Sequence, residues 1–213
     1  MTESLPPNQI ERREQRMPLL AVPEEMRNSV TGLPNEDALR LVTEDAIQRL
    51  PGNFAEIDMD LDGLQEHNTL YGHPDADEYL RTTGAVLGHS LRANDIVGIV
   101  AHPHGDEFRI IVGNVNTQDQ VDSIIDRLRD DLEEYGIEGS MGGRPHQVGE
   151  SATQLAIAAD NLMYQDKIDR KLSNYSAGQL REAHNLISRA TASGIRIRDL
   201  GLLAKVFEEN PPR

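Results

Sequence analysis

Two short apolar runs that flank a turn constrain the fold of this chain more than any other feature. The runs IVGIVA (96–101) and FRIIVG (108–113) are rich in β-branched residues, and HPHGDE separates them. Strands this close in sequence pair antiparallel, because parallel strands need a crossover of about a dozen residues or more. The sequence therefore predicts a β-hairpin, and a sheet that is antiparallel at least in part.

Hydrophobic periodicity and helix caps predict the other elements. Apolar residues at three- and four-residue steps indicate helices, and short apolar stretches bounded by glycine indicate strands. Strands mixed with helices favour an α+β domain around one sheet. We expect helices at about 36–50, 75–91, 117–132, 177–192 and 198–209, a helix opened by a capping box of Ser151 with Gln154, and further strands within 53–62 and 136–143.

The composition excludes several classes of protein. The 213 residues include 21 Lys and Arg against 36 Asp and Glu, a formal net charge of −15. This balance argues against a nucleic-acid partner, because duplex binding relies on clustered cations. Without cysteine there is neither a disulfide framework nor a thiolate metal site. No apolar run reaches the roughly 18 residues of a membrane span, and the start lacks a signal-peptide pattern, so we expect a soluble cytoplasmic protein.

Carboxylates gather at the predicted ends of two strands. Asp58, Asp60 and Asp62 alternate at the end of the first strand, and Asp106 and Glu107 lie at the tip of the hairpin. If the hairpin lies beside that strand, the carboxylates converge from neighbouring strands. This arrangement holds Mg²⁺ against phosphates in polymerase-like sites. A solvated strand end is the plain alternative.

A calcium loop is a second alternative for the acidic stretch. DMDLDG matches the start of an EF-hand, with Gly63 at the sixth position. The twelfth position is then Thr69, where a bidentate Glu is wanted, and a strand rather than a helix precedes the loop. We therefore regard calcium as the weaker interpretation.

Lysine is scarce, and two of the three lysines form a pair. Lys167 and Lys171 lie four residues apart after a strongly patterned helix, so they share one helical face. The pair is a candidate clamp for phosphate oxygens, although cations are also favoured at any helix end. No GxxxxGK(S/T) motif is present, so a triphosphate would not be held by a P-loop.

Together, these stretches resemble the GGDEF family, the diguanylate cyclases, from about Asn28 to Lys171. The matching motifs, in order, are TGLPN (31–35), DLDGLQEHNTLYGHPDAD (60–77), HGDEF (104–108), SMGG (140–143) and ADNLMYQDK (159–167). The resemblance implies a five-stranded, mainly antiparallel palm-type (ferredoxin-like) sheet wrapped by helices. We expect a tail or connector at 1–27, a nucleotide cyclase domain at 28–174 and a C-terminal helical extension at 175–213.

The resemblance also implies a reaction and its catalytic residues. Two GTP molecules would be joined into cyclic di-GMP with release of two pyrophosphates, and a homodimer is needed because each domain holds one GTP. Asp60, the backbone carbonyl of Leu61 and Asp106 would bind Mg²⁺ or Mn²⁺. Asp106 would also accept the proton of the 3′-hydroxyl, and Glu107 would support the cluster.

The substrate contacts follow from the same resemblance. Asn68 and Asp77 match the positions that recognise guanine, and an amide with a carboxylate can pair with its donor–acceptor edge. His73 follows as a further substrate contact. Lys167 matches the phosphate lysine of the family, and Lys171 stands where an Arg is usual.

Two features bear on regulation and on activity. Arg92 and Asp95 match the RxxD motif through which relatives bind their product at an inhibitory site. His104 replaces the first Gly of the signature, His102 an Arg, and Gln65 a Lys. These departures leave open a second hypothesis, a catalytically degenerate receptor of the same fold that binds GTP or cyclic di-GMP.

Overall fold

The computed structural model describes residues 22–93, 98–171 and 177–196. Residues 1–21 of the expected tail and the helix expected at 198–209 lie outside this part of the chain. In chain order the elements are η1 (Glu24–Met26), α2 (Glu36–Arg49), β1 (Phe54–Leu61), α3 (Leu64–Tyr71), α4 (His73–Ala93), β2 (Gly98–His104), β3 (Glu107–Gly113), α5 (Gln118–Glu133), β4 (Gly139–Pro145), α6 (Ala152–Lys171) and α7 (Ala177–Ala192).

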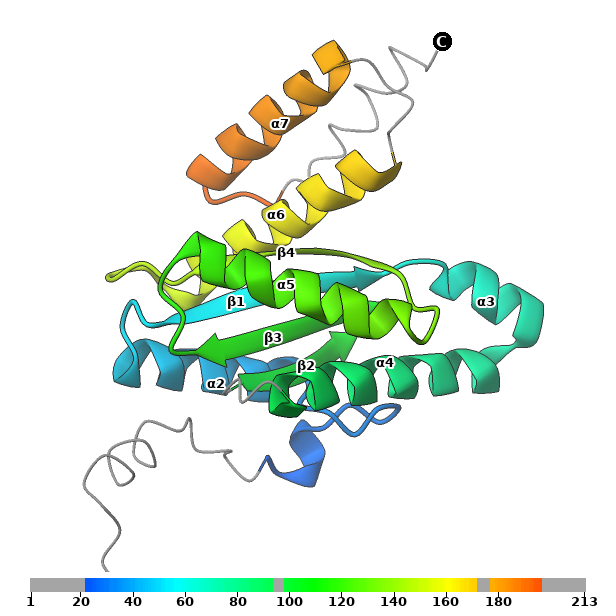
Figure 1. The fold of residues 1–213 in the computed structure, drawn as a ribbon. Helices are drawn as coiled ribbons and strands as arrows, with labels where there is room; N and C mark the ends of the chain where they lie inside the picture. The colour runs from blue at the N-terminus through cyan, green and yellow to red at the C-terminus, as the bar shows by residue number, and fades with distance from the viewer. Residues whose placement is uncertain (1–21, 94–97, 172–176, 197–213) are drawn as a thin grey trace, which may run out of the picture.

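One sheet organises the described residues. Its strands follow the order β2-β3-β1-β4, and every neighbouring pair is antiparallel (Figure 1). Helices α4 and α5 cover one face of the sheet, and α2 and α6 cover the other. The expected α+β class and the expected hairpin are confirmed.

The number of strands differs from what the resemblance implied. Five strands were expected, and the described residues form four. Only residues 134–138 connect α5 to β4, and Gly136 turns the chain there with φ of +66°. Only residues 146–151 connect β4 to α6. Neither connection has room for another strand of usual length together with its turns.

Side-chain caps fix where three helices begin. The Asn35 side chain accepts hydrogen bonds from two backbone N–H groups of the first turn of α2. Thr117 and Gln120 form a capping box at the start of α5. Ser151 and Gln154 do the same before α6, as expected. Each cap satisfies N–H groups that have no partner inside the helix.

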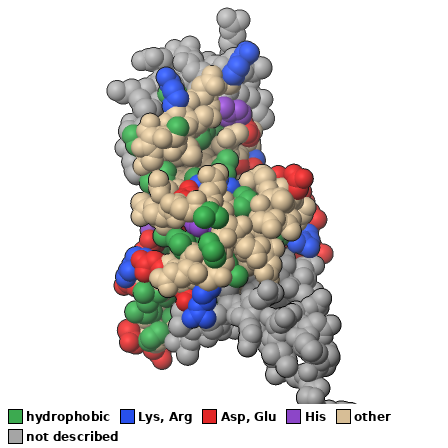
Figure 2. Space-filling model, turned by 90° about the vertical axis from the view of Figure 1, so that its left-hand side faces the viewer, with side chains coloured by type: hydrophobic (Ala, Val, Ile, Leu, Met, Phe, Trp, Pro, Cys, Tyr) green, Lys and Arg blue, Asp and Glu red, His purple; other side chains and the backbone are tan. Residues whose placement is uncertain are grey.

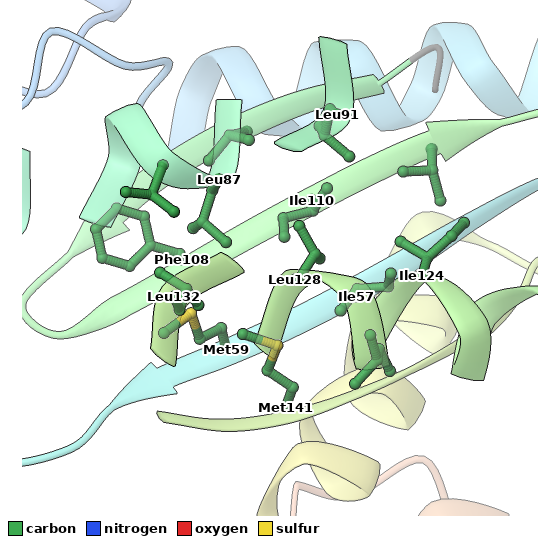
Figure 3. Packing of buried hydrophobic residues seen from close by; sticks show 14 of the residues in the cluster. Ile57, Met59, Leu87, Leu91, Phe108, Ile110, Ile124, Leu128, Leu132 and Met141 are labelled. Carbon is green, nitrogen blue, oxygen red and sulfur yellow. The ribbon is translucent and has the colours of Figure 1, made fainter. Parts of the chain in front are cut away.

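The main hydrophobic core lies between the sheet and helices α4 and α5. Figure 3 shows its side chains pointing toward one another from β1, β3, β4 and the two helices. The smaller cluster on the opposite face includes Phe54 and Leu155, packed against the apolar stripe of α2. The labelled residues of the main core are Ile57, Met59, Leu87, Leu91, Phe108, Ile110, Ile124, Leu128, Leu132 and Met141.

Both edges of the sheet are covered. Along β2, the His102 N–H donates to the carbonyl of Pro34 at 2.9 Å, and the Asn28 amide donates to the carbonyl of His102 at 3.1 Å. Along β4, side chains bind the outward backbone groups. These contacts are Arg170 to Gly139 O, Arg129 to Met141 O, Met141 N to Asp166, and Gln118 to Gly143 O. Contacts of this kind leave fewer backbone groups on the edge strands free to pair with another chain.

Helix α7 packs on α6 and projects from the sheet (Figure 1). Ile168 and Ile187 are buried between the two helices. The buried Asn161 of α6 donates to Thr191 Oγ1 and to the carbonyl of Ile195, each at 2.9 Å. The C-terminal end of α7 therefore lies against the first half of α6.

Charged side chains of both signs lie on the surface of the described residues. On the face shown in Figure 2, basic side chains lie in small separate groups among acidic, hydrophobic and neutral ones. Within the same part of the chain, none of the helices combines the length and apolar character needed to cross a membrane.

Candidate active site

The pairing of β1 with β3 brings the two acidic segments together. Asp60 lies opposite Glu107 in the sheet register. At the end of β1, the Leu61 N–H donates to the carbonyl of Asp106 at 2.9 Å. The expected adjacency of the first strand and the hairpin is therefore confirmed, and Asp60, Leu61, Asp106 and Glu107 lie at one end of two neighbouring strands.

Lys167 joins this group from α6. Its Nζ lies 2.6 Å from Asp60 Oδ2, although 107 residues separate the two in the sequence. Burial raises the pKa of the Asp60 carboxyl, and the negative charges of Asp106 and Asp62 raise it further, while Lys167 lowers it. Lys167 therefore offsets only part of the rise in pKa that burial and the two neighbouring carboxylates cause.

The donor set suits a hard divalent cation. Within the described residues, no three His, Cys, Asp or Glu side chains gather closely enough to form a metal site on their own. Mg²⁺ needs fewer protein ligands, because it retains waters and usually takes one or two carboxylates together with substrate phosphates. Asp60 and Asp106 supply such carboxylates, and a bound cation would favour the charged form of Asp60, which burial disfavours.

The calcium-loop interpretation is wrong. Asp58, its first position, is buried at 3% exposure and pairs with Arg109 at 3.5 Å instead of facing a loop. Its last position, Thr69, lies within α3 and donates its hydroxyl hydrogen to the carbonyl of Gln65. The segment is a strand, a turn and a helix.

A two-residue turn presents Asp106. Gly105 and Asp106 connect β2 to β3, and Gly105 has φ of +59°, a conformation that favours glycine at the first turn position. An irregularity in the β2–β3 pairing between Ala101 and His104 precedes the turn. A bulge of this kind re-aims the strand end, and here the strand end carries the acidic tip.

The buried side chain of His102 contacts the backbone of this turn. Its ring is 1% exposed and stacks on Phe108, with 4.7 Å between ring centroids. Burial lowers the pKa of His102, so the ring is neutral, with one donor and one acceptor nitrogen. Nε2 lies 3.0 Å from the Gly105 carbonyl and must donate, so Nδ1 accepts from the Thr31 hydroxyl at 3.1 Å. His102 is a structural link between TGLPN and the acidic tip.

His104 lies beside the site. Its side chain is 67% exposed, and its Nε2 lies 3.5 Å from Glu107 Oε2. The imidazole therefore occupies the outer rim of the hairpin and faces a residue of the acidic group.

The predicted base-recognition residues come from α3 and α4, which pack against each other. The Oδ1 atom of Asn68 is buried and has no hydrogen-bond partner among the described residues. Asp77 makes a long contact of 3.8 Å with Arg81, and its side chain is 41% exposed. His73 begins α4 and is exposed. His67 stacks on Tyr79 and contacts Tyr71, which ties the two helices together.

Comparison with known proteins matches this arrangement to one family. The family model described as "Diguanylate cyclase, GGDEF domain" matches residues 26–172, well over half of the chain. The chain belongs to the GGDEF domain family. The expected resemblance is confirmed.

Relatives of this GGDEF domain carry different names. The diguanylate cyclase DgcS of Shewanella oneidensis is 29% identical over 149 residues, 67% of this chain and 49% of the relative. The cyclic di-GMP phosphodiesterase PdeR of Escherichia coli is 28% identical over 150 residues, 66% of this chain and 22% of the relative. The chain thus spans about half or less of the length of these relatives.

A solved structure shows the same fold. It is a sensory box/GGDEF family protein from Caulobacter crescentus, with a TM-score of 0.60 and 25% identity. The similarity covers 68% of this chain and 99% of that one.

Three predicted residues of the GGDEF domain cannot be placed. The Lys171 and Arg92 side chains, at the ends of α6 and α4, and all of Asp95 lie outside the described part of the structure. The RxxD site and the second phosphate contact therefore stay predictions.

Two charged groups near the site were missed in the sequence. Arg170 of α6 binds Asp62 at 3.2 Å and also the carbonyl of Gly139. Its spacing of three residues from Lys167 places both on one helical face, and this was the available signal. The other group is Glu56 and Arg109, buried on the same face of the sheet as Asp60.

Proposed function

We propose that this GGDEF domain is a metal-dependent diguanylate cyclase that condenses two GTP molecules into cyclic di-GMP and two pyrophosphates. The observation that carries the proposal is the convergence of Asp60, Asp106 and Lys167 at one end of β1 and the hairpin. Two carboxylates and an ammonium group from three separate elements offer what a nucleotidyl transfer needs: a site for a cation, a proton acceptor and a phosphate contact.

The carboxylates have distinct roles in this proposal. Asp60, the Leu61 carbonyl and Asp106 would hold Mg²⁺ or Mn²⁺, which would make the 3′-hydroxyl more acidic and offset charge on the phosphoryl oxygens. Asp106, at the half-buried turn, accepts the proton of that hydroxyl. Glu107 lies opposite Asp60 in the sheet and keeps the group acidic.

Lysines would take the substrate phosphates. Lys167 Nζ lies 2.6 Å from Asp60 Oδ2, and this contact is only partly buried. A short movement of the flexible lysine side chain would let it pair with a phosphate oxygen in place of Asp60. A bound cation would replace it as the partner of Asp60. Lys171 is the proposed second phosphate contact.

Guanine would be held by α3 and α4. The unpartnered buried Oδ1 of Asn68 is an acceptor that awaits a donor, and guanine has N–H donors on its edge. The part-exposed carboxylate of Asp77 is a second acceptor, and His73 is the adjoining contact. These acceptors favour guanine over adenine, whose corresponding ring nitrogen carries no hydrogen.

The reaction requires two copies of the domain. One domain would hold one GTP, and each 3′-oxygen attacks the α-phosphate of the other molecule, so two sites must face each other. We propose a homodimer for the active state, with cyclic di-GMP returning to Arg92 and Asp95 as a product inhibitor.

A receptor without turnover is the second candidate. His104 favours it, because its ring contacts Glu107 at 3.5 Å where a glycine would leave the acidic tip open. The phosphodiesterase name of PdeR is a further reason to test turnover directly, since family membership alone does not assign the reaction.

Product analysis separates the two candidates. Purified protein is incubated with GTP and Mg²⁺ or Mn²⁺, and nucleotides are resolved by chromatography. We expect cyclic di-GMP from the wild type and none from Asp60→Asn or Asp106→Asn, because a neutral amide binds a hard cation poorly. Saturable GTP binding without cyclic product at any protein concentration would establish the receptor instead.

A further inference from the structure

A pocket lies between the sheet, α2 and the beginning of α6, on the face of the sheet that these two helices cover. Its volume is about 140 Å³. Glu56 of β1 and Arg109 of β3 line it, at 1% and 4% exposure. Arg40 of α2, Thr153 of α6 and Arg196 after α7 line it as well. None of these residues has a role in the proposed cyclase site.

Arg109 has donors to offer in this pocket. Its two ion pairs are long, 3.5 Å to Asp58 and 3.8 Å to Glu36. Charge-assisted hydrogen bonds are typically about 2.7–2.9 Å, so neither carboxylate satisfies the guanidinium closely. The buried guanidinium lines the pocket, so its N–H groups can donate to an acceptor that enters there.

Glu56 adds a buried group without a partner. Its Oε2 atom has no hydrogen-bond partner among the described residues. Burial raises the pKa of this carboxyl to about 8, and the neighbouring charge of Asp58 contributes to the shift. At neutral pH the side chain is therefore mostly protonated, so it donates a hydrogen bond and does not repel an anion.

Of the remaining walls, two arginines and the start of α6 favour negative charge, while the carboxylate of Glu36, which also lines the pocket, opposes it in part. The first turn of α6 meets the pocket through Ala152, Thr153 and Ala156, whose small side chains leave the helix start open. Backbone N–H groups at a helix start attract anions. Arg40 and Arg196 bring two more guanidinium groups from different elements.

We propose that this pocket binds one small tetrahedral oxyanion, of which inorganic phosphate is the simplest. The volume equals that of several water molecules at about 30 Å³ each, which is enough for such an ion. The ion accepts from Arg109, Arg40, Arg196 and the start of α6, and Glu56 completes its shell. Because Arg196 follows α7, the bound ion also connects the C-terminal extension to the sheet domain.

Titration calorimetry with inorganic phosphate tests this site, using the full chain at constant ionic strength in chloride. We expect one saturable site per chain. Arg196→Gln and Arg40→Gln each weaken binding by about tenfold, the usual loss for one charge-assisted hydrogen bond. Arg40 is exposed and Arg196 is half-buried, so neither substitution disturbs the core. Arg49→Gln is the matched control and binds like the wild type, because Arg49 lies on the same helix but pairs with Asp45 and does not line the pocket.

Two further variants test where the ion binds and whether it is an anion or a cation. Lys167→Met retains phosphate binding, which separates this pocket from the cyclase site. Glu56→Gln also retains phosphate binding, because the side-chain amide can still donate a hydrogen bond to the ion. If the pocket held a cation instead, this substitution would remove the carboxylate that binds it. Absence of saturable binding overturns the proposal. So does loss of binding in Lys167→Met with the Arg40 and Arg196 variants unchanged.

Discussion

Several ionisable side chains in this domain are buried or partly buried. Asp60 keeps its carboxylate beside Lys167 at the end of β1. Glu56 and Asp58 lie on the same face of the strand, deeper under α2 and α6, with Arg109 as the neighbouring cation. Such alternation is also typical of a strand with one solvated face, so the sequence alone did not reveal that these charges are buried.

Burial of Glu56 predicts a pH-dependent stability. Its pKa rises from 4.5 to about 8, with Asp58 and Glu36 raising it and Arg109 and Arg196 lowering it after the dominant effect of burial. A carboxyl whose folded-state pKa is raised contributes stability below the unfolded pKa, and that stability is lost as pH rises through the folded pKa. The free energy of unfolding should therefore fall between about pH 5 and pH 8.

Denaturant titrations across that range provide the check. In Glu56→Gln the decline is smaller, because the ionisable group is gone. Glu44→Gln, an exposed glutamate on α2, is the control and keeps the wild-type slope. Parallel pH profiles for the wild type and Glu56→Gln would contradict the assigned shift.

At the hairpin tip, His104→Gly is expected to raise turnover or nucleotide affinity. The substitution removes an exposed ring that contacts Glu107 and restores close backbone approach, at a modest entropic cost. The gain should stay below about tenfold, since one contact of roughly 1 kcal/mol is involved. Steady-state kinetics with GTP measure it. A loss of activity would show that the imidazole contacts the substrate.

Among the helices and strands, prediction from the sequence was most successful where the hydrophobic periodicity and the capping or turn residues indicate the same element. The stripe and capping box of α5 and the hairpin of β2 and β3 could be predicted because each is local. Helix α3 was missed because it has no apolar stripe at three- and four-residue steps. Two of its large apolar side chains, Leu70 and Tyr71, are 73% and 62% exposed. Packing against α4 stabilises it instead, and such a contact cannot be read from periodicity.

The side-chain contacts along the edge strand β4 could not be predicted from the sequence either. Arg129 and Asp166 come from different helices and bind the same residue of β4, Met141. Their convergence depends on the distance between α5 and α6, which no local pattern sets. The contact of Lys167 with Asp60 is of the same kind, and the sequence could supply only its candidate residues.

Helix α7 should depend on one buried amide. Asn161→Ala removes two hydrogen bonds to the end of α7 and leaves a cavity, at a cost of about 1–3 kcal/mol for the unmet partners. Native-state hydrogen exchange should then show faster exchange in α7, with unchanged protection in β1 and β3. Asn185→Ala, exposed on α7, is the control. Equal acceleration in the sheet would mean that α7 and the domain unfold as one unit.

At the scale of the whole molecule, the proposed reaction requires an encounter. The described surface holds one set of Asp60, Asp106 and Lys167 per chain, and the product contains two nucleotides. The net charge of −15 makes two copies repel, so dimer formation should strengthen with added salt. Divalent cations would both bind at the catalytic carboxylates and screen the repulsion between the two copies. Monovalent salt would only screen the repulsion, so it distinguishes the two effects.

The rate of cyclic di-GMP formation across a dilution series tests the central claim most directly. With saturating GTP and Mg²⁺, the wild type should form cyclic di-GMP, and its specific activity should fall on dilution as paired domains separate. Asp106→Asn at the same concentrations should form at least about a hundredfold less, the usual scale for loss of a proton acceptor. Product formation that is equal in the two proteins, or its absence from the wild type at every concentration, would contradict the account.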